Sequence, residues 1–146
     1  MNAQLSYREV AVRGASPVGL VILLYQQIIE DLRRAVVACE RNDIEARTRE
    51  INHALLVLGH LEATLDTENG LAVAQNLTRF YRQLRAALVE AQALQSRDRI
   101  ERQIALLMLV HAAWCEAERE LALPAGTPAV AGASAGSDRS PADWKA

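Results

Sequence analysis

Residues 16–40 read SPVGLVILLYQQIIEDLRRAVVACE, and the rest of the predicted architecture builds on this stretch. Ser16 can cap the free N–H groups of a helix start, and Pro17 suits the first helical position because no donor is needed there. Apolar residues then recur at spacings of three and four, as on one buried helix face: Val21, Leu24, Ile28, Leu32, Ala35 and Cys39. We predict a helix from Pro17 to about Glu40.

Three further segments repeat this periodicity. No proline occurs between Leu20 and Leu123, and the only glycines there are Gly59 and Gly70, so long helices can form. The expected buried faces comprise Ile44, Ile51, Ala54, Leu58, Leu61 and Leu65 in the second helix, Ala74, Leu77, Tyr81, Leu84, Leu88 and Ala91 in the third, and Ile100, Ile104, Leu107, His111, Trp114 and Leu121 in the fourth.

Polar residues mark the expected boundaries of these helices. Asn42 with Glu45 is read as a capping box that opens the second helix, and Asp98 with Glu101 is read as another that opens the fourth. Residues 66–70, Asp-Thr-Glu-Asn-Gly, have the composition of a turn between the second and third helices.

Short connections make consecutive helices antiparallel. The predicted fold is therefore all-α, an antiparallel up-down four-helix bundle with a short extra N-terminal helical segment and a disordered C-terminal tail. We assign residues 1–123 to the bundle domain, with residues 1–15 as its mobile N-terminal segment. Residues 124–146 are rich in Pro, Ala, Gly and Ser and are assigned to the tail, because they cannot bury enough apolar surface to fold.

The overall composition excludes several classes of protein. The 146 residues carry 16 basic and 18 acidic side chains, a net charge of −2, which argues against nucleic-acid binding driven by charge. The longest apolar run, Ile104–Val110, is far shorter than the roughly 20 residues of a membrane-spanning helix. Two cysteines suit a reducing compartment. We expect a cytoplasmic protein without membrane insertion.

The residues that could serve catalysis or metal binding do not form a complete motif in the sequence. Glu50 and His53 form one Glu-x-x-His pair, but a carboxylate-bridged metal site in a bundle needs a second copy and two more glutamates. Cys39 and Cys115 are too far apart along their predicted helices to form a disulfide. The sequence contains no phosphate-binding glycine loop and no nucleophile motif. We predict no metal, no cofactor and no enzymatic activity.

The chain has more apolar surface than one stripe per helix requires. Residues 18–29, 55–58 and 104–110 are apolar on nearly all sides. Such a surplus is typical of a partner-binding groove that takes an amphipathic helix. The alternatives are that the N-terminal segment, a dimer interface or tight packing covers it, and the residues alone leave these alternatives open.

Four blocks of sequence occur in a characteristic order and spacing. The first block is Tyr7 followed by Ala15-Ser16-Pro17 and the apolar run Leu20–Tyr25. The others are Asn42-Asp43-Ile44, the segment from Leu65-Asp66 through Gly70 to Asn76-Leu77 with Tyr81, and Trp114 of the last helix. Together they resemble the FliS family of flagellar secretion chaperones, over about residues 3–121. Gln26 and Arg82 depart from it, because the family usually carries aspartate there.

The resemblance implies an export chaperone that binds the disordered C-terminal region of flagellin and prevents its premature polymerisation. Its partners would be that flagellin segment and components of the flagellar export apparatus, and the chaperone itself would be a monomer or a homodimer. The alternative is a generic helical module for protein interaction or homodimerisation, with another client.

With that role in mind, we expect a groove between the second and third helices. Its apolar area would come from Ile51, Leu55, Leu58, Ala74 and Leu77, and Asn76 would offer its amide to the client backbone. Tyr7 would belong to a segment that lies over the groove when no client is bound. Alternatively, the apolar residues are plain core and Tyr7 is a fixed anchor. Tyr25, Tyr81 and Trp114 are expected in the core, with both tyrosine hydroxyls at the bundle edge.

Overall fold

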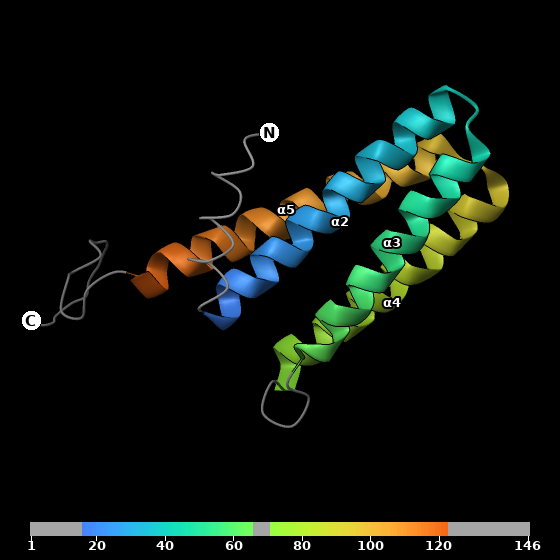
Figure 1. Ribbon diagram of the computed structural model, residues 1–146. Helices are drawn as coiled ribbons and strands as arrows, with labels where there is room; N and C mark the ends of the chain where they lie inside the picture. The colour runs from blue at the N-terminus through green and yellow to red at the C-terminus, as the bar shows by residue number, and fades with distance from the viewer. Residues whose placement is uncertain (1–15, 66–70, 123–146) are drawn as a thin grey trace, which may run out of the picture. The chain divides into compact units, whose positions relative to one another are not determined.

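A computed structural model describes residues 16–65 and 71–122. Within these ranges the chain forms helices only, namely α2 (Pro17–Glu40), α3 (Ile44–Ala63), α4 (Leu71–Leu94) and α5 (Arg97–Ala122) (Figure 1). The all-α prediction is confirmed. The predicted N-terminal helical segment, the predicted turn at residues 66–70 and the predicted tail lie outside the described residues.

The start of α2 follows the predicted chemistry. The Ser16 hydroxyl accepts a hydrogen bond from the Gly19 N–H at 3.0 Å, and Pro17 occupies the first helical position. The helix ends at Glu40, as its periodicity indicated. The predicted start and end of this helix are therefore confirmed.

The connection between α2 and α3 differs from the prediction in the residue that caps α3. Asn42 adopts a left-handed backbone with φ of 55°, which asparagine tolerates better than most residues, and so it ends α2. The next residue, Asp43, caps α3 by accepting the N–H of Ala46 on its carboxylate at 3.0 Å. The capping box predicted for Asn42 and Glu45 is therefore wrong, because Asn42 is needed to reverse the chain.

The corner between α4 and α5 is built in the same way. Gln95 has a left-handed φ of 52°, and the Ser96 N–H reaches back to the carbonyl of Ala91 at 3.1 Å, as in a Schellman-type helix end. The Ser96 hydroxyl accepts the Arg99 N–H at 3.2 Å. Ser96 therefore caps α5, and the prediction that Asp98 would do so is wrong, since Asp98 already lies in the first turn.

Contacts between side chains establish the direction of the helices. In each pair of neighbours the contacting residue numbers rise on one helix as they fall on the other, so the two helices are antiparallel. The pairs are Asp31–His53 and Arg34–Glu50 between α2 and α3, Arg47–Gln92 and Glu62–Arg85 between α3 and α4, and Arg33–Met108 and Glu40–Arg97 between α2 and α5. The up-down bundle is confirmed.

All four helices contribute to one apolar core. Its largest fully buried side chains include Tyr25, Leu32, Ile51, Leu58, Tyr81, Leu84, Leu88, Ile100 and Leu107. Four of the predicted core positions are not part of this cluster, namely Ile44, Ala74, His111 and Leu121. Ala74 is nevertheless only 4% exposed and His111 is partly buried, whereas Ile44 in the first turn of α3 is 56% exposed and Leu121 near the end of α5 is 73% exposed. No helix in the described ranges is long and apolar enough to cross a membrane.

Candidate functional site

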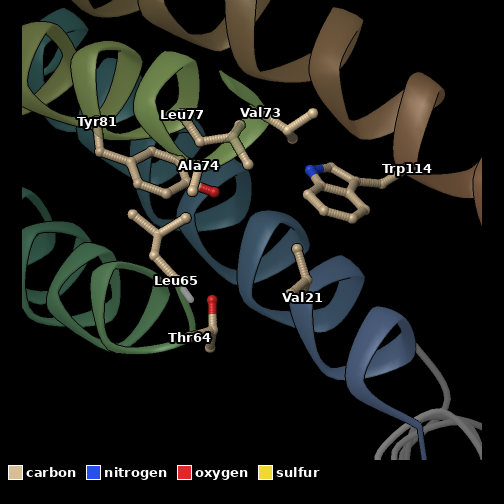
Figure 2. Close-up of a pocket in the computed structure, with 8 residues that line it drawn as sticks. All are labelled: Val21, Thr64, Leu65, Val73, Ala74, Leu77, Tyr81 and Trp114. Atoms are coloured by element: carbon tan, nitrogen blue, oxygen red, sulfur yellow. The ribbon is translucent and has the colours of Figure 1, made fainter. Parts of the chain in front are cut away.

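An apolar pocket opens where the end of α3 meets the start of α4. Its volume is about 170 Å³. Helices α2 and α5 complete the walls, so four separate elements converge on it (Figure 2). The lining residues are Val21 of α2, Thr64 and Leu65 after α3, Val73, Ala74, Leu77 and Tyr81 of α4, and Trp114 of α5.

Two buried tyrosines anchor the inner end of the pocket. The hydroxyl oxygens of Tyr25 and Tyr81 lie 2.9 Å apart and share a hydrogen bond, and both side chains are almost fully buried. Burial raises the pKa of both phenols above their usual value of about 10, and for Tyr81 the bond to Tyr25 raises the pKa further. The hydroxyls were predicted at the bundle edge, which is wrong, because the two meet in the buried interior, where one donates to the other.

Trp114 forms one wall of the pocket. Its ring centroid lies 6.5 Å from that of Tyr25, and the side chain packs against the core while staying partly exposed. Figure 2 shows the indole extending from α5 toward Val21 and the residues of α4 across the opening. Trp114 was expected in the core, but the structure gives it two environments, the core and the pocket.

The lining can bury apolar groups and offers little else. Three of the eight lining residues carry polar side-chain groups. The Thr64 hydroxyl donates to the Leu61 carbonyl at 2.6 Å, the Tyr81 hydroxyl bonds to Tyr25, and the Trp114 indole N–H is directed at the Tyr25 hydroxyl. A pocket with satisfied polar groups and exposed apolar walls favours an apolar ligand group. The arrangement therefore suits the side chains of a protein segment.

Three of the predicted site residues lie at or beside this pocket. Ala74 and Leu77 line it. Asn76 is exposed on the neighbouring turn of α4, and its side-chain oxygen accepts a hydrogen bond from Arg79 at 3.2 Å. The start of α4 thus brings together the residues that were expected on the third helix.

The predicted residues of the second helix lie elsewhere. Ile51 and Leu58 are 0% exposed and belong to the core, and Leu55 is partly buried against the same core. They line the interior between the helices and not the pocket. Tyr7 lies outside the described residues.

Two lining residues, Thr64 and Val73, carry no strong signal in the sequence. Thr64 and Val73 lie close to the two sides of the predicted turn, where periodicity is weakest, and they were not singled out. Val73 is 65% exposed. A large apolar residue off the buried stripe, beside a predicted turn, is the signal that could have pointed to it.

The Glu-x-x-His pair takes part in a polar cluster between α2 and α3. His53 bonds to the fully buried carboxylate of Asp31 at 2.5 Å, and Glu50 accepts from Arg34 at 3.1 Å. Arg34 also donates to Asp31 at 2.7 Å. Both members of the pair thus bond to α2, where they fix the register of the two helices. Asp31 was not singled out from the sequence, because a lone aspartate within an apolar stripe carries no distinctive motif.

Comparison with known proteins shows which protein family the chain matches. The model of a family described as flagellar protein FliS matches residues 1–121. The chain belongs to the FliS family of flagellar secretion chaperones. Gln26 is partly buried on α2 and Arg82 is exposed on α4; these are the two positions at which the sequence was expected to depart from the family.

Named relatives agree with this family. The flagellar secretion chaperone FliSB of Pseudomonas aeruginosa is 34% identical over 118 residues, which cover 78% of this FliS chain and 94% of that protein. The flagellar secretion chaperone FliS of Salmonella typhimurium is 32% identical and is covered over 83% of its length. That of Campylobacter jejuni is 33% identical and is covered over 93%.

Proposed function

We propose that this protein is a cytoplasmic export chaperone that holds the C-terminal segment of flagellin. By holding this segment it prevents premature polymerisation and supports delivery to the flagellar export apparatus. Membership of the FliS family supports the general role. The observation that carries the finer proposal is the apolar pocket between α3 and α4, which has the chemistry of a site for apolar side chains.

The pocket contributes a limited but specific contact. A cavity near 150 Å³ can hold a molecule of the size of benzene, so the about 170 Å³ here accepts one or two apolar side chains of a client. On the α4 wall of the pocket, Val73 is the exposed residue and Leu77 lies further in. A disordered segment that folds as it binds loses conformational entropy. This cost offsets part of the favourable binding free energy, so the complex can still dissociate.

The remaining predicted residues take different roles in this proposal. Asn76 offers its amide N–H groups to the client backbone beside the pocket, and Ala74 keeps the wall low enough for a client to approach. Ile51, Leu55 and Leu58 support the helices on which the pocket is built. Tyr7 belongs to the segment that precedes α2, and we propose that this segment covers the pocket in the absence of client. No step requires catalysis.

Isothermal titration of the full chain with a C-terminal flagellin peptide from the same genome tests the proposal. We expect a one-to-one complex with a negative heat-capacity change and a gain of helicity. Val73→Asp should weaken binding about tenfold or more, since burying one valine is worth about 1.5 kcal/mol or more. Val73 is well exposed, so the bundle should stay folded by circular dichroism.

Val89→Asp is the matched control, because Val89 lies on the same helix, is 53% exposed and does not line the pocket. It should bind like the parent protein. Equal loss of affinity in both variants would contradict the pocket assignment. Absence of any binding to the peptide would contradict flagellin as the client and favour the generic interaction module.

A further inference from the structure

A second cavity lies along the seam between α2 and α5. Its volume is about 240 Å³, and it is lined by Arg33 and Val36 of α2 and by Glu101 and Ile104 of α5. No residue lines both this cavity and the pocket beside Trp114. Val36 and Ile104 are partly buried against the core, so the cavity combines an apolar base with one cation and one anion. We call it the α2–α5 groove.

The charges of the groove stand at its two ends, because α2 and α5 run side by side in opposite directions (Figure 1). Near one end, Arg33 donates to the sulfur of Met108 at 3.4 Å. Arg33 is exposed, and no carboxylate of the described residues forms an ion pair with its guanidinium. At the other end, Glu40 and Glu101 share the guanidinium of Arg97, at 3.2 Å and 3.6 Å. Carboxylate oxygens remain there for a further cation.

The chain beyond α5 contains a segment of matching chemistry. Residues 143–145 read Asp-Trp-Lys, an aromatic residue with an acid before it and a base after it. Residues 124–142, which join this segment to the bundle, consist largely of Ala, Gly, Ser and Pro, the composition of a linker. A cavity near 150 Å³ holds benzene, so about 240 Å³ suits the two fused rings of the Trp144 indole.

We propose that residues 143–145 dock in the α2–α5 groove of their own chain, with the Trp144 indole between Val36 and Ile104. The linker has a suitable length. From Ile104 to Ala122, α5 rises about 27 Å at about 1.5 Å per residue, and the chain from Ala122 to Trp144 has a typical end-to-end distance of about 26 Å. A tether of this kind gives an effective concentration of about 1 mM, so a weak contact suffices.

The order of the charges agrees with this placement. A chain that turns back from the end of α5 runs antiparallel to that helix, so it meets the Arg33 end of the groove first and the Glu101 end last. Asp143 then faces Arg33, and Lys145 faces Glu101. The docking goes beyond the proposed function, because it uses a different cavity and a segment outside the family match, which ends at residue 121.

Acrylamide quenching of the Trp144 fluorescence in the full chain tests the proposal. Trp114→Phe leaves Trp144 as the single tryptophan, and a peptide of residues 137–146 gives the quenching constant of the undocked segment. We expect a constant at least about twofold lower in the protein, because the tether keeps the indole docked for most of the time. A constant equal to that of the peptide would overturn the proposal.

Two further measurements keep this result unambiguous. Protection of Trp144 should not change on dilution, because the contact lies within one chain, and protection that is lost on dilution would overturn the proposal in favour of docking on a second copy. If Trp114→Phe loses helicity by circular dichroism, fluorine NMR of the parent chain labelled with fluorotryptophan makes the same comparison without that substitution.

Charge variants test the orientation of the segment. Arg33→Glu places an acid opposite Asp143 and should raise the quenching constant toward that of the peptide, while the bundle stays folded because Arg33 is exposed. Arg82→Glu is the matched control, because Arg82 is an exposed arginine of α4 that lines neither cavity. Arg33→Glu combined with Asp143→Arg should restore protection, since the ion pair is re-formed with its signs exchanged. Equal quenching in Arg33→Glu and Arg82→Glu, or no recovery in the double variant, would contradict the proposal.

Discussion

The two ends of the bundle differ in how the helices terminate and pack. At one end, Asn42 and Gln95 reverse the chain within single left-handed residues, and Asp43 and Ser96 cap the following helices at once. At the other end α2, α3, α4 and α5 converge without filling the space between them, and the pocket beside Trp114 remains. One end is closed by hydrogen bonds, and the other presents apolar surface.

The comparison shows that composition does not separate core from site. Leu58 and Leu77 belong to the same type of apolar stripe, yet one is fully buried by neighbouring helices and the other faces a cavity. Burial depends on which helices stand opposite and how far they extend. The difference is therefore one of packing, and it can be tested by matched substitutions.

The largest effect is expected for Leu58→Ala. Leu58 is 0% exposed, so removal of its side chain should leave a cavity and lower the free energy of unfolding by about 2–5 kcal/mol. Val73→Ala at the open end should change the free energy by no more than about 0.5 kcal/mol. Urea denaturation monitored by circular dichroism measures both. A small effect at Leu58 would contradict its assignment to the core.

The prediction of the fold succeeded where periodicity was strong. Long segments with no proline beyond the first helical position and few glycines predicted the four helices, and the short connections predicted their direction, because a helix with one apolar stripe has few ways to bury it. The caps were harder, since Asn42 and Asp43 are both good capping residues by type. Which one caps depends on the backbone that the corner imposes, and this is set by the packing of the two helices.

An intermediate effect is expected at the inner end of the pocket. The contribution of these two tyrosines to the free energy of unfolding should be constant below about pH 10 and should fall above it, because the unfolded chain ionises its tyrosines near that value, whereas Tyr25 and Tyr81 have raised pKa values when folded. The folded state then binds more protons, so rising pH favours unfolding.

Denaturation of the parent and of a Tyr25→Phe/Tyr81→Phe variant at about pH 8 and about pH 11 measures this contribution. The double variant should lose less stability between the two values. Each single variant should be about 1–3 kcal/mol less stable than the parent at neutral pH, because it leaves a buried hydroxyl unpaired. Identical pH profiles for the parent and the double variant would rule out a role for the pair.

The smallest effect is expected at the closed end. Asp43→Ala should lower the free energy of unfolding by about 1 kcal/mol, because it removes the acceptor of the Ala46 N–H. Glu45→Ala should cost less, since Glu45 does not complete a capping box with Asn42 in this corner. If thermal denaturation ranked Glu45→Ala as the more damaging change, the capping box read from the sequence would be restored.

The pocket itself could be predicted only in part. The stripe on α4 led to Ala74 and Leu77, because a helical stripe continues past the edge of the core. Thr64 and Leu65 come from the chain after α3, and Val21 and Trp114 come from helices far away in the sequence. Their convergence follows from the lengths and offsets of four helices, which one sequence does not determine.

The position of Trp114 in the pocket wall makes its intrinsic fluorescence a probe of pocket occupancy. An indole that borders a partly open apolar cavity and lies 6.5 Å from a tyrosine ring emits at a wavelength that depends on the water around it. A client side chain in the pocket would displace that water and shift the emission to the blue. Because Trp144 is the other tryptophan of the chain, its replacement by phenylalanine would leave a single fluorophore that reports occupancy without any attached label.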